Sequence, residues 1–351
     1  MTTESKFLIY GATGYTGKLV VHMAVKDGLK PLLSGRNSKM LKQLAEPLGL
    51  EYEAVFLDNQ DALERLLEKV DIVLHIAGPF SATARPMVQA CLNTQTHYLD
   101  ITGEIPIFEK HFRLDDQARE KDIMIMSGVG FDVVPTDCLS AHLKKRMPDA
   151  TELTLSLAGS GGLSPGTAKT VVEGIGYGTA VRREGNIVEI EGALHGKADF
   201  GRGERETIAI GWGDVSTAFH TTGIPNITVF FKSTSALKFV AGMGKRMKGI
   251  LGKQWIQRIL KNRIERLVKG PDDEARSKGY CIIVGEVKNK KGSVMKSRLL
   301  TPEGYTLTCL CALEILRQVQ QGNFRAGFGT PAGVYGADFI LQFEGVERED
   351  L

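Results

Sequence analysis

Short apolar runs alternate with amphipathic segments over the first 126 residues of this 351-residue chain. The apolar runs predict strands at residues 7–10, 31–35, 52–57, 70–77, 97–100 and 123–126. Segments with a helical apolar period predict helices at residues 39–48, 62–69, 85–92 and 107–121. Strands and helices that alternate at these lengths form parallel sheets through right-handed crossovers. The first part of the chain is therefore expected to be an α/β domain.

The pattern changes near residue 150, where strands follow one another. Apolar or alternating runs predict strands at residues 152–158, 186–191, 207–210, 227–233, 280–287 and 293–300. Such runs are typical of a second α+β domain built on a mostly antiparallel sheet. Helical patterns return after residue 301 and again near residue 330. We therefore predict domains at residues 1–135 and 150–300, and C-terminal helices within residues 301–351.

Three glycines follow the first strand in the run Gly11-Ala-Thr-Gly14-Tyr-Thr-Gly17. A side chain at Gly11 would block a tight turn, Gly14 would let the backbone approach a pyrophosphate, and Gly17 would let the next helix lie close to the strand. The N-terminus of that helix offers N–H groups to an anion. The sequence thus predicts a dinucleotide-binding turn in a Rossmann-like, doubly wound parallel sheet. The remaining cofactor contacts expected from this turn are Thr13, Tyr15 and Thr16.

The second strand indicates which dinucleotide is bound. NAD-specific sites carry an Asp or Glu at the end of this strand, roughly 20 residues past the glycines, to bind the ribose 2′-hydroxyl. Residues 31–39 contain no acid, and Arg36 stands where the 2′-substituent would lie. A guanidinium suits a phosphate better than a hydroxyl, so we predict NADP(H), with Ser34 as a second contact. The alternative for Arg36 is a solvated loop cation.

Two further loops follow predicted strands. Asp58 ends the third strand, where the adenine is expected. The run Ala77-Gly78-Pro79-Phe80 follows the fourth strand, at the switch point where such sheets hold their ligand. We therefore expect these five residues to contact the cofactor.

Composition narrows the class of protein. The 44 Lys and Arg against 41 Asp and Glu give a net charge of +3, which provides no reason to expect nucleic-acid binding. The five cysteines are odd in number and lack a C-x-x-C pair, so we expect a reducing compartment, no disulfide framework and no metal site. We find no signal-like segment before the first strand and no apolar run of 18 residues, and we therefore expect a cytoplasmic protein.

Four motifs stand in the first 137 residues. They are the glycine turn, the run at residues 77–80, His97-Tyr-Leu-Asp-Ile-Thr-Gly-Glu104 and Gly130-Phe-Asp-Val-Val-Pro-Thr-Asp137. Together they resemble the motifs of the saccharopine dehydrogenase-like oxidoreductases. The chain looks most similar to the branch of the trans-acting enoyl reductases, which residues 161–167, 212–214 and 221–226 also resemble. The resemblance implies an NADP(H)-dependent oxidoreductase whose C-terminal helices return to pack on the nucleotide domain.

The resemblance also implies which residues lie beside the substrate. In saccharopine reductases the motif positions of Tyr98 and Asp132 line the substrate pocket next to the nicotinamide. A tyrosine can donate a proton to a developing enolate, and Asp132 can hold or tune it. We therefore name Tyr98 and Asp132 as candidate catalytic residues. The neighbouring Asp100 and Asp137 also suit helix caps or turns, and His75 also suits a buried core histidine.

Two patterns narrow the reaction. None of the eight tyrosines is followed four residues later by a lysine, which argues against the Tyr-x-x-x-Lys machinery of short-chain dehydrogenases. Saccharopine carries several carboxylates and needs convergent arginines. Arg182, Arg183, Arg202 and Arg205 form no pattern that predicts a bidentate clamp. Saccharopine itself is therefore not the expected substrate.

Residues 244–269 form a basic amphipathic segment. Nine of them are Lys or Arg, and Glu265 is the one acid. From Trp255 onward the apolar residues fall on one helical face. Such a helix suits an anionic membrane surface or an acidic partner such as an acyl carrier protein. The alternative is a packed surface helix with a solvated cationic side.

These patterns favour a reductase that transfers a hydride from NADPH to an acyl or enoyl substrate delivered by a carrier or a membrane. Reduction of an imine or amino-acid-derived substrate is one alternative, and an NADP(H)-binding sensor or scaffold without turnover is another. The expected partners are a small-molecule or carrier-bound acyl substrate and, through residues 244–269, a peripheral membrane or acyl-carrier contact. A homodimer is compatible with the sequence, which determines neither the substrate nor the oligomeric state.

Overall fold

The computed structural model describes residues 6–159, 162, 164–166, 168, 179–243, 251 and 253–351. The chain forms two compact units: the first comprises Met1–Asp132 and Tyr305–Val334, and the second comprises Val133–Gly304 and Tyr335–Leu351. Part of the basic segment, residues 244–250 and 252, lies outside the described residues, as do residues 161, 163 and 167 of the motif at 161–167.

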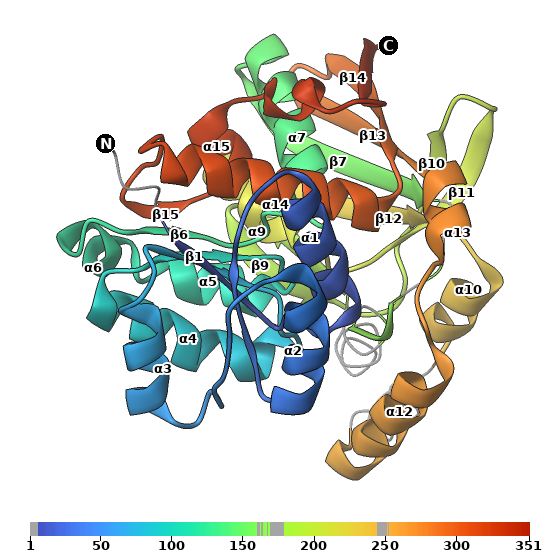
Figure 1. Cartoon of the computed structure of the whole chain (residues 1–351). Helices are drawn as coiled ribbons and strands as arrows, with labels where there is room; N and C mark the ends of the chain where they lie inside the picture. The colour runs from blue at the N-terminus through green and yellow to red at the C-terminus, as the bar shows by residue number, and fades with distance from the viewer. Residues whose placement is uncertain are drawn as a thin grey trace. The chain divides into compact units, whose positions relative to one another are not determined.

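The first unit is built on a seven-stranded sheet with the order β15-β6-β5-β4-β1-β2-β3 (Figure 1). All neighbouring strands run parallel. Its strands are β1 (Phe7–Tyr10), β2 (Leu32–Gly35), β3 (Tyr52–Ala54), β4 (Ile72–His75), β5 (His97–Asp100), β6 (Met124–Met126) and β15 (Gly327–Gly329). This order places the switch point between β1 and β4, as in a Rossmann fold. The predicted doubly wound parallel sheet is confirmed.

The strands of this sheet are short and apolar because both of its faces are covered. All four residues of β1 and all four of β4 are buried. The helices of the unit are α1 (Tyr15–Lys26), α2 (Ser38–Ala45), the 3₁₀ helix η1 (Glu46–Leu48), α3 (Gln60–Leu67), α4 (Phe80–Thr94), α5 (Ile105–Phe112), α6 (Asp115–Glu120), α14 (Gly304–Gln320) and α15 (Pro331–Tyr335). Near-continuous apolar strands are what a sheet buried on both faces requires.

The single helix predicted at residues 107–121 is wrong, because the structure has two helices there. α5 ends at Phe112 and α6 begins at Asp115. The side chain of Asp115 accepts a hydrogen bond from the backbone N–H of Phe328 in β15 at 2.8 Å. A contact between residues so far apart in the sequence fixes the start of α6, and no local pattern reveals it.

The C-terminal tail contains strands as well as the helices that the sequence predicts. β15 pairs in parallel with β6, and β16 (Glu347–Asp350) pairs antiparallel with β14 (Val294–Pro302) of the second sheet. β15 has only three residues and β16 is entirely polar. Neither carries the apolar alternation by which strands are recognised in a sequence.

The second unit contains a nine-stranded sheet with the path β10-β11-β12-β7-β13-β14-β16, and β8 and β9 lie off this path. The pair β12 and β7 is parallel, and the other pairs are antiparallel. The remaining strands are β7 (Ala150–Gly159), β8 (Thr179–Arg183), β9 (Asn186–Ile190), β10 (His195–Asp199), β11 (Glu204–Ala209), β12 (Asn226–Lys232) and β13 (Tyr280–Asn289). The predicted α+β unit with a mostly antiparallel sheet is confirmed.

Two helices cover one region of this sheet. α7 (Val134–Arg146) packs against β13, β14 and α9 (Asp214–Thr222), and α9 packs against β12. α7 is buried around most of its circumference in its first two turns, so it lacks the amphipathic period that predicts a helix. The other helices of the unit are α10 (Ser235–Ala241), α12 (Gln254–Leu267), α13 (Asp273–Lys278) and the 3₁₀ helix η2 (Phe339–Gln342). In the described part of the chain, no helix has the length and apolar content to cross a membrane.

Candidate cofactor and active site

The glycine turn between β1 and α1 has no room for side chains at two of its three glycines. Gly11 has φ +90°, and a Cβ there would lie 2.8 Å from the backbone nitrogen of Ala77. A Cβ on Gly17 would overlap the carbonyl oxygen of Gly11 and lie 2.9 Å from the carbonyl carbon of Ala12. These positions therefore need glycine for the turn itself, before any ligand is considered.

Gly14 differs from the other two glycines. It is exposed, its φ is −70°, and a Cβ there would meet only the carbonyl oxygen of Gly11, at 3.4 Å. Gly14 is the N-cap of α1, and its N–H donates to the Gly11 carbonyl at 3.1 Å. The surface of the turn is thus bare backbone at a helix N-terminus, which fits a pyrophosphate. The flanking Thr13, Tyr15 and Thr16 are half-buried.

The ends of β2 and β3 lie beside this turn. The backbone carbonyl of Ser34 accepts hydrogen bonds from the N–H groups of Gly11 at 2.9 Å and Ala12 at 3.3 Å. The Ser34 side chain is fully buried, and its hydroxyl has no hydrogen-bond partner within the described residues. Arg36 and Asp58 are exposed. Ser34 thus supports the turn through its backbone, while the exposed Arg36 presents a cation just after the carboxyl end of β2.

Tyr10 shows that Arg36 and Asp58 flank the same end of the sheet. Its hydroxyl donates to the Val55 carbonyl at 2.8 Å. Burial raises the pKa of Tyr10 to about 12; the charge of Arg36 opposes this shift and the charge of Asp58 adds to it. Both charges therefore act on one hydroxyl at the tip of β1, near the predicted position of the adenosine.

The loop of residues 77–80 is held from within its own helix. The Thr83 hydroxyl donates to the carbonyl of Ala77 at 2.6 Å and also contacts that of Pro79 at 3.1 Å. Behind it, Nε2 of the fully buried His75 lies 3.1 Å from the same hydroxyl. Burial lowers the pKa of His75 to about 3, so this histidine is neutral at physiological pH.

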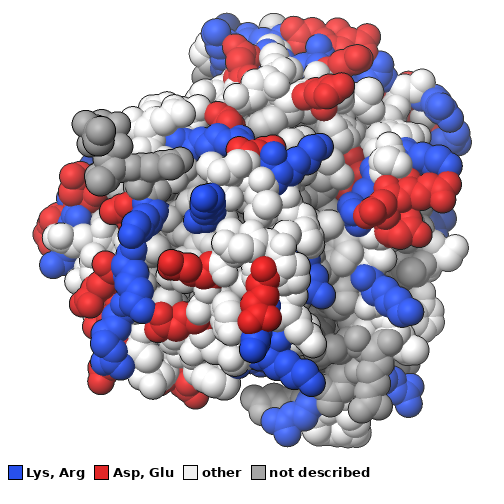
Figure 2. Space-filling model, in the orientation of Figure 1, with Lys and Arg blue, Asp and Glu red and all other residues white. Residues whose placement is uncertain are grey.

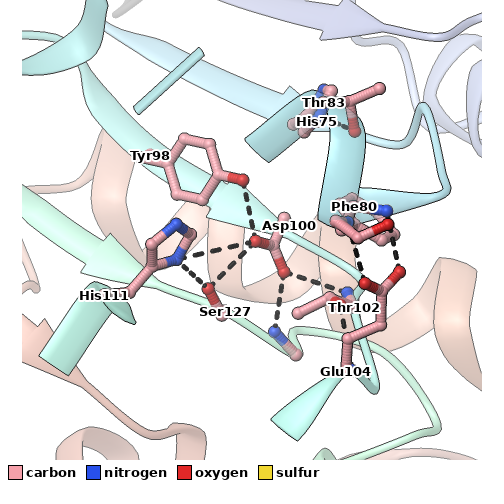
Figure 3. A network of polar contacts seen from close by, with 11 residues as sticks. His75, Phe80, Thr83, Tyr98, Asp100, Thr102, Glu104, His111 and Ser127 are labelled. Atoms are coloured by element: carbon pink, nitrogen blue, oxygen red, sulfur yellow. Dashed lines mark hydrogen bonds and ion pairs between the residues drawn. The ribbon is translucent and has the colours of Figure 1, made fainter. Parts of the chain in front are cut away.

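Glu104, in the loop that follows β5, also holds the loop of residues 77–80. The carboxylate of Glu104 accepts hydrogen bonds from the backbone N–H groups of Phe80 at 2.7 Å and Ser81 at 2.8 Å (Figure 3). These two groups are the first N–H groups of α4, which have no partner inside the helix. A carboxylate at this position also interacts favourably with the helix dipole. Glu104 is therefore the N-terminal cap of α4, supplied from another loop.

Asp100 is the centre of a buried network at the end of β5 (Figure 3). Oδ2 accepts from the hydroxyls of Tyr98 at 2.8 Å and Ser127 at 2.9 Å. Oδ1 accepts from the backbone N–H groups of Thr102 at 2.9 Å and Gly128 at 3.1 Å. Burial raises the pKa of Asp100 to about 6, although these hydrogen bonds favour the charged form.

The network continues from Ser127 to His111. Nδ1 of His111 lies 2.7 Å from the Ser127 hydroxyl. Because that hydroxyl donates to Asp100, His111 donates to it through Nδ1. Burial lowers the pKa of His111 to about 4, so the ring is neutral. The sequence analysis assigned no role to His111 or Ser127, because nothing local in the sequence connects them to Asp100.

The two candidate catalytic residues have different surroundings. Tyr98 is fully buried, and burial raises the pKa of its hydroxyl, which the charge of Asp100 raises further. Asp132 is only partly buried by surface exposure, yet desolvation raises its pKa to about 7. A Cβ on Gly103 would lie 2.9 Å from Oδ2 of Asp132, so this carboxyl lies over the loop that follows β5. Their catalytic roles stay predictions.

The predicted cofactor residues thus lie at or just after the carboxyl ends of β1, β2, β3 and β4, and the glycine turn contacts the loop after β4. Tyr98 is linked to the end of β5 through Asp100, and Asp132 to the loop that follows β5. Glu104 and Thr83 join them without having been predicted. The motif at residues 97–104 contained Glu104, but its partners stand 24 and 23 residues earlier. Within the described residues, no group of three or more His, Cys, Asp or Glu could hold a metal ion.

A protein-family model matches most of the first unit. Residues 7–126 match the family model of the saccharopine dehydrogenase NADP-binding domain. This match confirms the prediction of NADP(H) as the cofactor and the family resemblance of the motifs. The contact of Arg36 with the 2′-phosphate stays a prediction.

Curated relatives and a solved structure agree with this domain. The chain is 32% identical over 151 residues to the trans-acting enoyl reductase of Mycobacterium ulcerans, covering 41% of this chain and 36% of that protein. It is 27% identical over 212 residues to the saccharopine dehydrogenase-like oxidoreductase of Rattus norvegicus, covering 52% and 49%. The alignments thus span half or less of the length of these relatives. Apo saccharopine dehydrogenase (L-Glu forming) from Saccharomyces cerevisiae has the same fold, with a TM-score of 0.69 at 11% identity over 99% of this chain and 100% of that one.

Proposed function

We propose that this protein is an NADP(H)-dependent oxidoreductase that acts as a reductase. The observation that carries the proposal is the bare glycine turn at the N-terminus of α1, beside the switch point and next to Arg36. NADPH supplies a hydride when bound, and the residues of the chain bind it, orient it and provide a proton.

Asp132 is the proposed proton donor. Its pKa of about 7 leaves the carboxyl largely protonated below neutral pH, which a group that gives a proton to a reduced substrate requires. The hydroxyl of Tyr98 is committed to Asp100 inside a buried network. Proton donation by Tyr98 would therefore require that hydrogen bond to be exchanged, and we assign Tyr98 the second place.

The pH dependence tests this order. With Asp132 as the donor, the kcat of reduction is expected to fall about tenfold per pH unit above pH 7, and Asp132→Asn should lower kcat by about 10²-fold or more and abolish this slope. Tyr98→Phe should keep the slope. If Tyr98→Phe instead loses 10²-fold and Asp132→Asn turns over normally, the tyrosine is the donor.

The proposed substrate is an acyl or enoyl group. The relatives named trans-acting enoyl reductase favour this class, because they match the chain at up to 33% identity. Arg182 and Arg183 of the second unit give no support to a substrate with several carboxylates. Arg182 is buried and donates to the carbonyls of Val215 at 2.7 Å and Gly185 at 2.5 Å, and Arg183 donates to the Thr228 hydroxyl at 3.0 Å. Both guanidinium groups are therefore engaged within the fold.

The substrate class is tested by NADPH oxidation with a panel of compounds. Enoyl and acyl thioesters are expected to support turnover, whereas an imine formed from an amino acid and an aldehyde is expected not to. Turnover with the imine alone would establish the amino-acid alternative. Tight NADPH binding without oxidation of NADPH by any class, in the presence of membranes and acyl carrier protein, would identify a sensor or scaffold.

We further propose that α10 and α12 dock on an anionic membrane surface from which the substrate is taken. Phe239 of α10 is 70% exposed, and Trp255 and Leu267 of α12 are 63% and 78% exposed. Arg258 and Arg263 are exposed on α12 as well, and the coloured side chains in the lower right of Figure 2, where α12 lies, are blue. Large apolar side chains among cations suit the interface of an anionic bilayer.

Vesicle binding tests this surface. Replacing Lys253, Arg258 and Arg263 by glutamine should weaken binding to phosphatidylserine-containing vesicles on the order of 100-fold, because each cation contributes about 1 kcal/mol. The matched control replaces three exposed lysines of the β13–β14 hairpin by glutamine: Lys288, Lys290 and Lys291.

The emission of Trp255 gives a second readout of the same surface. It should shift on mixing with vesicles, measured in a Trp212→Phe background because the chain has two tryptophans. Binding to an acidic acyl carrier protein but not to vesicles would replace the membrane by the carrier. Binding to neither would overturn the proposal.

A further inference from the structure

The Glu104 carboxylate performs a task that the proposed chemistry does not include. Both of its oxygens are occupied by the first two N–H groups of α4, from Phe80 and Ser81. A hydrogen bond to a charged carboxylate is stronger than one between neutral groups. The distances of 2.7 and 2.8 Å are those of such charge-assisted bonds. The backbone at the start of α4 is therefore fixed by a side chain from the β5–α5 loop.

The loop that carries Glu104 is itself anchored in the buried network. The Glu104 N–H donates to the Thr102 hydroxyl at 3.0 Å, and the Thr102 N–H donates to Asp100 at 2.9 Å. Between them, Gly103 lies under the carboxyl of Asp132. Consecutive residues of one short loop thus contact the proposed proton donor and the start of α4. A shift of Glu104 away from α4 would therefore also move Gly103 relative to Asp132, and the reverse.

The loop before α4 lies against the dinucleotide turn. A Cβ on Gly11 would lie 2.8 Å from the nitrogen of Ala77 and 2.9 Å from the carbonyl carbon of Ile76. The N–H of Ile76 also donates to the Tyr10 carbonyl at 2.8 Å. Residues 77–80 therefore continue the cofactor surface from the pyrophosphate turn toward β5, where the nicotinamide end of NADP(H) is expected.

We propose that Glu104 is a positioning residue that holds residues 77–80 in the conformation that receives the nicotinamide end of NADP(H), and that couples this loop to Asp132. The placement of the nicotinamide rests on the proposed function. Glu104 itself touches neither cofactor nor substrate in this arrangement, because its carboxylate faces the α4 backbone. Its effect is the ordering of backbone before the cofactor arrives.

Two ligands that differ only in the nicotinamide half test this proposal. NADPH and adenosine 2′,5′-bisphosphate share the 2′-phosphate and the adenosine, but the second lacks the nicotinamide. Glu104→Ala is expected to weaken NADPH binding about tenfold and adenosine 2′,5′-bisphosphate binding less than twofold, measured by calorimetry. Glu104→Gln should give an intermediate loss, since its amide oxygen still accepts one of the two N–H groups. Equal losses for both ligands, or no loss for NADPH, would overturn the proposal.

A matched control separates positioning from general destabilisation. Glu64 likewise accepts two hydrogen bonds with one carboxylate, but from side chains: that of Gln60 and that of Asn93 near the other end of α4. Glu64→Ala should leave both affinities unchanged. If Glu104→Ala does not fold, the same pair of ligands is compared with Glu104→Gln. Because binding is measured without turnover, failure to find a reducible substrate would count against the proposed function and leave the outcome for Glu104 intact.

Discussion

The helices α1 and α4 both begin at the switch point of the first unit, but their N-termini differ in how the first backbone N–H groups are bonded. α1 begins behind Gly14, and its first turn contains no acid and no side-chain capping bond in the described structure. α4 begins with Phe80 and Ser81, whose N–H groups are both bonded to Glu104. The two helices follow adjacent parallel strands, β1 and β4. One helix end is open to an anion and the other is already closed by one.

This difference assigns the two ends separate tasks. An anion at α1 gains the helix dipole and unblocked backbone, whereas an anion at α4 would meet the negative charge of Glu104. We therefore expect the pyrophosphate at the N-terminus of α1. The N-terminus of α4 has a structural task instead. The N–H groups of Phe80 and Ser81, which would otherwise bond to water or a ligand, already bond to Glu104.

We expect the largest effect from substitutions in the glycine turn at the N-terminus of α1. Gly17→Ala would place a methyl group on the Gly11 carbonyl, so it should destabilise the fold by about 3 kcal/mol and abolish measurable NADPH binding. Gly14→Ala is the matched variant, because its Cβ would be 3.4 Å from the nearest atom. It should keep the melting temperature and weaken NADPH by obstructing the exposed backbone. Normal binding by Gly17→Ala would show that the turn is not the pyrophosphate site.

We expect a smaller effect at the adenosine end of NADPH, where Arg36 is predicted to bind the 2′-phosphate. Arg36→Ala should weaken NADPH binding by about 1.5–3 kcal/mol, the size of a hydrogen bond to a charged group, and change NADH affinity little. Lys30→Ala, an exposed cation before the opposite end of β2, is the control and should change neither. Equal losses of NADPH and NADH in Arg36→Ala would remove the 2′-phosphate assignment.

The open end of α1 could be predicted from the sequence, and the closed end of α4 could not. The open end depends on three glycines within seven residues, directly after an apolar strand, so the whole feature is local. The closed end depends on Glu104 reaching back 24 residues to Phe80, between two strands that become neighbours only in the sheet. The sequence placed Glu104 inside a motif without showing which backbone it would meet.

The same distinction explains the fold. The strands of the first sheet were predictable because burial on both faces makes them continuously apolar. α7 was not predicted because burial on most sides removes its period, and the break after α5 was not predicted because Asp115 bonds to a distant strand. For the candidate catalytic residues, the motif gave their identity, but the pKa values depend on how completely the fold removes water from Asp132 and Tyr98.

We expect the smallest effect on NADPH binding from removing the second contact that holds residues 77–80, the hydroxyl of Thr83. Thr83→Val keeps the shape of the side chain but removes the hydroxyl that bonds the carbonyls of Ala77 and Pro79. Nε2 of the buried His75 loses its contact with this hydroxyl as well. The free energy of unfolding should therefore fall by about 1–3 kcal/mol, and NADPH binding should weaken by a few-fold while adenosine 2′,5′-bisphosphate binding stays constant. Thr94→Val removes a comparable bond, to Ala90, at the far end of the same helix. It should lower stability alone, since the start of α4, where the proposed function places the cofactor, is unchanged. If both threonine variants affect NADPH alike, the contrast between the two ends of α4 is lost and the loop is only a part of the general packing.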